Sequence, residues 1–285
     1  MPSYRFCRPD DIPYLVRALN ECYFVHFPDR SPMTVDRFRD EMKRLDVWPS
    51  NSMVASTNTG PVAVMIGTKR SQEVLIQRVG VHPDHQRQGH ALHMMTSLSQ
   101  KLAVLGPERL IVEVPRGLAG LQQLVEAADY EHELTYTDYL RPPSEGTAGP
   151  EEWVVPVDVG DLLGQDWMDD GSESAWVRAP ETLSNSQGEL KALALASPER
   201  LEAALIFDPE VSGDQVTILA LGAQDPERGD LFLGLLVNTL AARHPGHHLR
   251  LPNWAPTQEA KARLLTLGFQ AGASHDRFGA VARPA

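Results

Sequence analysis

The sequence has few of the features that mark secreted or membrane-spanning proteins. Its 285 residues include only two cysteines, Cys7 and Cys22, so a disulfide framework is excluded and a reducing compartment is expected. No apolar run reaches the ~18 residues of a membrane-spanning helix, and we expect no membrane partner. Residues 1–5 lack the basic-then-apolar order of a signal peptide. These absences predict a cytoplasmic protein.

Basic residues are scarce as well. Residues 1–145 hold 16 Lys and Arg against 18 Asp and Glu, whereas residues 146–285 hold 10 against 20. No basic stripe is present, so we expect no nucleic-acid partner. An acidic second half is typical of a solvated surface that aids solubility. Attraction of a cationic partner or an amine substrate is the alternative.

The length suits two domains of ordinary size, and a hydrophobic share of 42% is enough for two cores. Prolines and glycines cluster between residues 141 and 150, where they disfavour both helix and sheet. We therefore predict one domain over 1–141, a linker over 142–152 and a second domain over 153–285.

Apolar spacing in the first half predicts an alternation of strands and helices. Helical spacing occurs over 12–22, 35–45, 91–102 and 118–128. Shorter apolar runs predict strands over 53–56, 62–67, 74–81, 110–114 and 134–140. The predicted order is strand, two helices, three strands, helix, strand, helix, strand, which is an α/β class.

The most informative segment joins the strand over 74–81 to the helix that follows it. The strand ends in Val79, Gly80 and Val81, a polar turn follows, and residues 86–91 read Gln-Arg-Gln-Gly-His-Ala. A helix N-terminus presents backbone N–H groups without internal partners and a partial positive charge, so it binds phosphate readily. Gly89 and Ala91 are small residues, so a bulky anion can come close to the backbone at these positions.

This segment resembles the GCN5-related N-acetyltransferase (GNAT) superfamily, whose signature (Q/R)-x-x-G-x-(G/A) is matched by Gln86, Gly89 and Ala91. The resemblance implies mixed twisted sheets flanked by helices, acetyl-CoA as co-substrate and no metal. The following residues would then bind acetyl-CoA, the first three through pantetheine and the others through pyrophosphate: Val79, Gly80, Val81, Gln86, Arg87, Gln88, Gly89, His90 and Ala91.

The catalytic acid and base are less clear. Many members of that family place a tyrosine acid four residues before a Gly-Phe pair, but here the pair is Asp129-Tyr130 and the position holds Val125. We therefore take Tyr130 as a candidate acid, with core packing as the alternative. Glu113 interrupts an apolar strand and is the candidate base, with a surface carboxylate as the alternative.

An aromatic group lies between the first two helices, where the resembling family lines its acceptor pocket. Tyr23, Phe24 and His26 are the candidate substrate-binding residues, and ordinary core packing is the alternative. The loop histidines have no cysteine or carboxylate company of the kind a zinc site uses, so we expect solvated side chains and no metal. They are His82, His85, His90 and His93.

The second half repeats the first in a weaker form. Residues 219–221 lie 140 positions after residues 79–81, and Gly229 lies 140 after Gly89. In the second loop Pro226 lacks an N–H, Asp230 repels phosphate and Leu231 replaces the small Ala91. We expect a shortened, degenerate copy without an acyl-CoA site.

Three functions are compatible with these observations. The first is an acetyl-CoA-dependent N-acetyltransferase acting on a small-molecule or peptide amine, as a monomer or homodimer, with the chemistry in the first domain. The second is a CoA-binding module without turnover whose second domain recruits a partner or ligand. The third is a structural protein, against which the intact loop around Gly89 argues.

Overall fold

The protein forms two compact units that do not follow the predicted boundary at residue 141. A computed structural model describes residues 2–143, 153–168 and 173–284. Unit 1 holds residues 1–134 and 276–285, and unit 2 holds residues 135–275. Each unit therefore includes a strand segment from the other half of the sequence. Residues 144–152 of the predicted linker lie outside the described residues.

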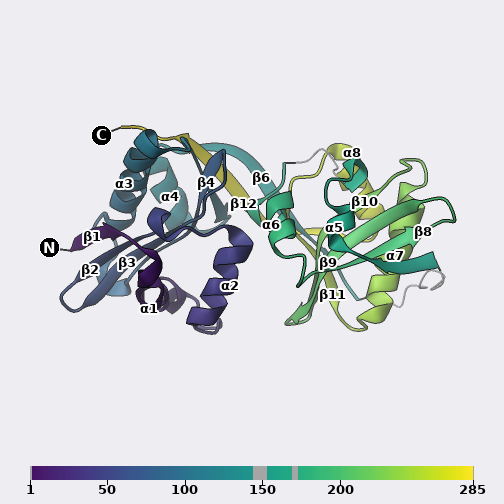
Figure 1. Ribbon diagram of the computed structural model, residues 1–285, viewed down its shortest axis with the longest axis horizontal. Coiled ribbons are helices and arrows are strands. Elements are labelled where there is room, and N and C mark those ends of the chain that lie inside the picture. The colour runs from purple at the N-terminus through teal and green to yellow at the C-terminus, as the bar shows by residue number, and fades with distance from the viewer. Residues whose placement is uncertain (1, 144–152, 169–172, 285) are drawn as a thin grey trace. The chain divides into compact units, whose positions relative to one another are not determined.

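Unit 1 has the predicted order of elements, and most boundaries agree within three residues (Figure 1). Its elements are β1 (Ser3–Phe6), α1 (Ile12–Cys22), α2 (Val35–Leu45), β2 (Met53–Thr57), β3 (Gly60–Gly67), β4 (Glu73–Val81), α3 (His90–Leu105), β5 (Arg109–Pro115), α4 (Ala119–Ala127) and the start of β6 (Glu131–Arg141), which continues into unit 2. The class, α/β with a mixed sheet flanked by helices, is confirmed.

Local sequence explains why the first two helices begin where they do. A proline occupies one of the first two positions of α1, where a missing N–H costs little. Thr34 caps α2, because its hydroxyl accepts a hydrogen bond from the Arg37 N–H at 3.2 Å. Asp46 then ends α2 in the left-handed conformation, with φ of 57°.

The strands of unit 1 run in the order β1-β2-β3-β4-β5, followed by the end of β12 (Gln270–Val281). Antiparallel pairs join β1 through β4, whereas β4 and β5 are parallel. Helices α3 and α4 cover one face, and α1 and α2 lie on the other side of the strands (Figure 1). Both faces are therefore buried, as a partly parallel sheet requires.

The last residues of the chain complete the core of unit 1. Phe278 and Ala282 are buried among residues from β3, β5 and α3. The Ala282 N–H donates to the Glu108 carbonyl at 2.6 Å, and the Arg277 guanidinium pairs with Glu133 at 2.9 Å. The unit therefore takes its final strand from the other end of the sequence.

Unit 2 has the same order of elements as unit 1, so the expectation of a shortened copy is wrong. Its first helices are very short, which is why their periodicity is not visible in the sequence. Its elements are β7 (Val154–Val157), α5 (Val159–Leu162), α6 (Pro180–Asn185), β8 (Lys191–Ala196), β9 (Leu201–Ser212), β10 (Gln215–Ala223), α7 (Gly229–Arg243), β11 (His248–Trp254), α8 (Gln258–Thr266) and β12.

Unit 2 is also covered by helices on both faces of its sheet. Its strands run in the order β6-β11-β10-β9-β8-β7. Side chains from α7 and α8 pack on one face, and those from α5 and α6 pack on the other. In the described part of the chain, no helix is long and apolar enough to span a membrane.

Candidate active site

Strands β4 and β5 separate within unit 1. Their parallel pairs run from Glu73 with Arg109 to Ile76 with Val112, although β4 continues to Val81. The separation begins at a β-bulge, because Ile66 and Gly67 of β3 pair with Arg78 and Ile76 and leave one extra residue between them. Such a bulge bends its strand and interrupts pairing. The extra residue, Gln77, thus marks the start of a gap in the sheet.

The gap opens into a cleft of about 1090 Å³ that lies within unit 1. The walls come from both strands, from the loop before α3, from the start of α4 and from the segment between α1 and α2. The lining residues are 23, 26, 27, 30, 76–81, 85–87, 89–92, 95, 112–115, 117–121 and 123–125. Of the predicted acetyl-CoA residues, all except Gln88 line it.

The backbone of β4 presents groups to this cleft that are not hydrogen-bonded to a neighbouring strand. The His82 N–H donates to the Val62 carbonyl at 2.9 Å, so hydrogen-bonded pairs with β3 fall on alternate residues such as Gly80. Val79 and Val81 therefore direct their N–H and C=O groups to the side that β5 has left. The Val81 carbonyl accepts a hydrogen bond from His26 Nε2 at 2.9 Å.

The loop before α3 leaves the helix N-terminus open. Gly89 is the N-cap of α3 with φ of 81°, a conformation that favours glycine, and no side chain caps the helix. A Cβ atom built on Gly89 would meet nothing within 4 Å. The first turn contains no acidic residue. Free amides and the helix dipole therefore face the cleft without a competing carboxylate.

Gly80 has a packing role. A Cβ at this position would lie 2.5 Å from the Cys22 carbonyl oxygen and 2.8 Å from the Tyr23 Cα. Glycine is thus required because the end of α1 crosses β4 at backbone contact. This crossing places Tyr23 and His26 at the cleft. Gln88 does not line the cleft, and its side-chain amide donates to the Asp84 carbonyl at 3.5 Å.

The segment between α1 and α2 forms an aromatic wall with a cation at its end. Tyr23 and Phe27 have ring centroids 5.1 Å apart, and the Arg30 guanidinium lies 5.2 Å from the Phe27 centroid. Phe24, which was also predicted to bind substrate, does not line the cleft because only 8% of it is exposed and it packs behind this wall.

The two predicted catalytic residues have different environments. Glu113 is half-buried on β5 and lines the cleft. Tyr130 does not line it, because it is 6% exposed and belongs to the core under α3. Burial raises the pKa of Tyr130 far above its ordinary value. The position expected for a tyrosine acid is held by Val125, which forms part of the apolar wall of the cleft.

The loop histidines lie beside the open helix end. His90 is 5% exposed, and the Tyr4 hydroxyl lies 2.5 Å from its Nδ1. Desolvation by burial, reinforced by His85 and His93, lowers the pKa of His90, so it is neutral at neutral pH. Among the described residues, no three His, Cys, Asp or Glu side chains are arranged to hold a metal ion.

A buried ion pair at the start of the gap escaped sequence analysis. The Glu41 carboxylate of α2 accepts hydrogen bonds from Arg78 Nη1 at 2.5 Å and Nη2 at 3.0 Å, and from Gln77 Nε2 at 2.9 Å. The Glu41 and Arg78 side chains are only 8% and 16% exposed. The available signal was a glutamate within the apolar stripe of a helix, between Phe38 and Leu45.

Unit 2 contains the same separation of strands, but a side chain fills it. Parallel pairs between β10 and β11 end at Thr217 and Arg250, although the strands continue. Arg178 Nε donates to the Leu219 carbonyl at 2.8 Å, and its guanidinium lies 4.0 Å from the Trp254 ring centroid. Arg178 is 8% exposed. The groove that is open in unit 1 is therefore occupied here by the protein itself.

The loop before α7 in unit 2 is also occupied, although no side chain caps the helix itself. Asp225 accepts hydrogen bonds from the N–H groups of Glu227 at 2.9 Å and Arg228 at 3.4 Å, so a carboxylate holds these loop amides. The Arg263 guanidinium pairs with Asp230 at 2.8 Å and lies 3.4 Å from a Cβ built on Gly229. Unlike Gly89, Gly229 is not in the left-handed conformation.

The repeat is also shifted relative to the sequence alignment. Strands β4 and β10 both have nine residues. Gly80 and Gly222 occupy the same position in these strands and are 142 residues apart in the sequence. A Cβ on Gly222 would clash with the Trp167 carbonyl, as one on Gly80 would with Cys22. The alignment of residues 219–221 with residues 79–81 is therefore wrong by two positions.

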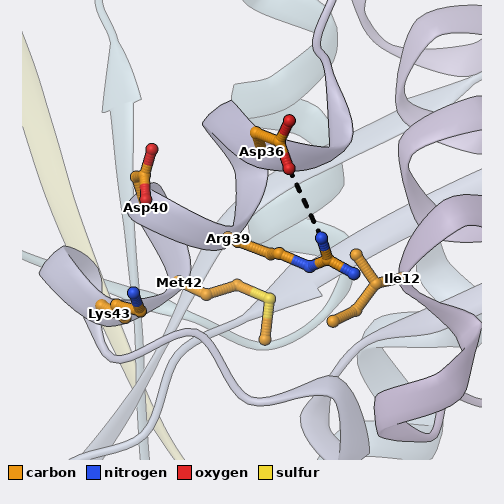
Figure 2. A pocket seen from close by; sticks show the side chains of 6 residues that line it. All are labelled: Ile12, Asp36, Arg39, Asp40, Met42 and Lys43. Atoms are coloured by element: carbon orange, nitrogen blue, oxygen red, sulfur yellow. Dashed lines mark hydrogen bonds and ion pairs between the residues drawn. The ribbon is translucent and has the colours of Figure 1, made fainter.

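A smaller depression on α2 carries no catalytic arrangement. Figure 2 shows Ile12 and Met42 surrounded by Asp36, Arg39, Asp40 and Lys43. Asp36 and Arg39 form an ion pair at 3.4 Å with 91% and 56% of their side chains exposed. These charges belong to a solvated helix face, so the cleft remains the candidate active site.

A known family model matches the part of the chain that holds the cleft. The acetyltransferase (GNAT) family model matches residues 12–126, a range that includes every residue lining the cleft. The region of the match runs from the start of α1 to α4. A comparison with curated proteins gave no match. Residues 12–126 are thus similar to GNAT-family domains.

Solved structures extend the likeness to the whole chain. A tandem GNAT protein from the clavulanic acid biosynthesis pathway is 11% identical with a TM-score of 0.68, and the match covers 100% of both chains. A GCN5-related N-acetyltransferase from Sphaerobacter thermophilus is 13% identical with a TM-score of 0.64, over 100% of this chain and 96% of that one. One from Anabaena variabilis is 14% identical with a TM-score of 0.64, over 99% and 73%. The chain therefore has the GNAT fold in two tandem copies.

Proposed function

We propose that this chain, part of which is similar to GNAT-family domains, transfers an acetyl group from acetyl-CoA to an amine within the cleft of unit 1. The observation that carries the proposal is the open gap between β4 and β5 next to an uncapped helix N-terminus. The acceptor is a small-molecule or peptide amine, since the cleft is open beside the aromatic wall of Tyr23 and Phe27.

The residues present fit acetyl-CoA. The amides around Gly89 would bind the pyrophosphate, because they have no capping side chain and the glycine leaves room for a bulky anion. The backbone groups of Val79 and Val81 would pair with the pantetheine arm along the open edge of β4. The apolar side chains of Leu121, Leu124 and Val125 would exclude water from the opposite wall.

Acetyl-CoA supplies an activated thioester carbonyl that an amine can attack directly. A backbone N–H in the position of Val79 would stabilise the negative charge that develops on the carbonyl oxygen. A fixed donor in a dry cleft is worth far more than the same donor in water. Holding both reactants in line would supply much of the remaining acceleration.

Proton transfer falls to Glu113 in this proposal. Glu113 lies on β5 in the wall of the cleft, where a carboxylate can take the proton of the attacking amine directly or through a water molecule. A covalent route through cysteine has no support, because burial raises the pKa of the nearby Cys22 thiol to about 12. Tyr130 is too deeply buried to protonate the leaving thiolate, so the thiolate takes its proton from the protonated Glu113 carboxyl or from water.

Amine-dependent release of CoA tests the proposal. Purified protein is incubated with acetyl-CoA and pooled amines, and free thiol is followed with time. We expect release that depends on both the amine and the protein, and a Glu113→Gln variant should lower kcat by about 100-fold, within the usual range for general-base catalysis. Binding of acetyl-CoA with no release under any amine pool would contradict transfer.

A CoA-binding module without turnover is the second candidate. The specific observation in its favour is that Val125 stands at the usual position of the acid while Tyr130 is buried in the core. In that case acetyl-CoA binds as tightly as in the first proposal. No amine-dependent thiol release then occurs in the wild type or in Glu113→Gln, and the variant binds acetyl-CoA as the wild type does.

A further inference from the structure

We propose that Glu41 is a positioning residue for acyl transfer, because it fixes the point at which β4 leaves β5. The proposal rests on the proposed function of the cleft. It concerns three side chains, Glu41, Gln77 and Arg78, which we call the clamp. All three lie in unit 1, and Gln77 and Arg78 line the cleft.

The first observation is the place of Glu41 in α2. Its buried face consists of Phe38, Glu41 and Leu45, so a carboxylate takes a position that the helical pattern assigns to an apolar side chain. A buried carboxylate is costly unless it is paired and hydrogen-bonded. An apolar residue would satisfy packing alone, so the carboxylate at this position fits a role in orienting its partners.

The second observation is the identity of those partners. Glu41 does not pair with an arbitrary neighbour: it binds the side chains of the extra residue of the β4 bulge and of the residue that follows it. Gln77 donates one hydrogen bond and Arg78 donates two in a forked arrangement. A forked guanidinium–carboxylate pair fixes direction as well as distance.

The third observation is what lies on either side of the clamp. Val79 follows Arg78 directly, and its backbone faces the cleft. The Arg78 guanidinium lies 5.7 Å from the Tyr23 ring centroid and 5.6 Å from that of Phe24. The clamp therefore joins α2 and the aromatic wall to the strand that presents the Val79 N–H. Displacement of this strand by about 1 Å can cost a factor of about 100 in rate.

The test uses a variant that removes the clamp and leaves no buried charge. Glu41→Met combined with Arg78→Met replaces the ion pair with apolar side chains, a change that buried pairs often tolerate. Asp36→Asn is the matched control, because it breaks an exposed ion pair on the same helix. Arg78→Lys keeps the charge and loses the fork. Thermal unfolding shows which variants are folded.

Positioning predicts a split between binding and turnover. In the folded double variant, the Kd for acetyl-CoA should stay within about threefold, since the phosphate-binding amides around Gly89 are untouched, while kcat falls at least tenfold. Arg78→Lys should fall between wild type and the double variant, and Asp36→Asn should match wild type. An unchanged kcat in the double variant, or equal loss of kcat and affinity, would overturn the proposal.

Amide hydrogen exchange gives a readout that does not need activity. Arg78 and Gly80 pair with β3, and their amides should exchange at least tenfold faster in the double variant, whereas the Leu75 amide, bound to Thr68, should not change. If the wild-type protein shows no amine-dependent thiol release, the proposed function fails. Amide hydrogen exchange alone then tests whether the clamp holds β4 in place. Unchanged exchange at Arg78 and Gly80 would then overturn the clamp.

Discussion

The two units share one order of elements but differ in what occupies the gap in the sheet. In unit 1 the gap between β4 and β5 is an open cleft. In unit 2 the gap between β10 and β11 is filled by Arg178, which binds the Leu219 carbonyl and packs on Trp254. The same fold thus contains an open cleft in one copy and a packed interior in the other.

The difference extends to the helix N-terminus beside each gap. No side chain caps α3 or α7, but in unit 2 Asp225 accepts hydrogen bonds from the loop amides before α7, and Arg263 covers the start of that helix. A carboxylate there repels phosphate and takes its donors. A few side chains are therefore enough to change what the loop can bind, with the order of elements unchanged.

The largest expected effect is at the open helix end. Gly89→Glu should weaken acetyl-CoA binding at least 100-fold, because it adds bulk and negative charge where phosphate would lie. Gly213→Glu is the matched control, since Gly213 is also left-handed, with φ of 67°, and also open, but lies in unit 2. Calorimetry measures both variants. Equal affinities of Gly89→Glu and Gly213→Glu for acetyl-CoA would show that the N-terminus of α3 does not bind it.

In each unit a preceding segment crosses the strand at a glycine, Gly80 or Gly222, and both crossings should contribute equally to stability. Gly80→Ala and Gly222→Ala each place a Cβ against backbone, and we expect each to lower the free energy of unfolding by about 1–3 kcal/mol. Gly188→Ala, which would meet nothing within 4 Å, is the control. Denaturant unfolding measures all three. A harmless alanine at Gly222 would show that the crossings are not equivalent.

Arg178, which fills the gap in unit 2, should stabilise that unit without affecting the binding of acetyl-CoA. Arg178→Met removes a buried hydrogen bond and a cation–π contact, so we expect a loss of about 1–2 kcal/mol in unfolding free energy. Arg200→Met, at an exposed ion pair, is the control. Calorimetry should show no additional acetyl-CoA site in Arg178→Met, because Asp225 still holds the loop amides.

The smallest effect concerns pH. Burial lowers the pKa of His90, so the folded protein binds fewer protons at this group than the unfolded chain does. Its contribution to stability is therefore unfavourable in acid: the free energy of unfolding falls as pH drops through the unfolded value of about 6.5 toward the lower folded pKa. His90→Asn should reduce this slope, as measured by denaturant unfolding at a series of pH values.

Strong periodicity explains what the sequence predicted. Helix α2 was expected over 35–45 and is observed at those residues, because Thr34 and Phe38 give a cap and an apolar stripe. The signature at Gln86, Gly89 and Ala91 located the open helix end. The pair Asp129-Tyr130 also matches Gly268-Phe269 in structure, since Asp129 and Gly268 both have positive φ.

Tertiary pairing explains what the sequence did not predict. Residues 276–285 belong to unit 1, although nothing local in Phe278 distinguishes it from a strand residue of unit 2. The four-residue α5 is too short to show a period. Glu41 and Arg78 are 37 positions apart in the sequence. Arg178 and the Leu219 carbonyl to which it donates are 41 positions apart. Such contacts appear only when the fold is known.

The stoichiometry of acetyl-CoA binding tests the comparison of the two units most directly. Calorimetric titration of the wild-type chain should give one site per chain, and Gly89→Glu should remove it. This result would assign binding to the open cleft of unit 1. Two sites per chain, or one site that survives in Gly89→Glu, would contradict the account.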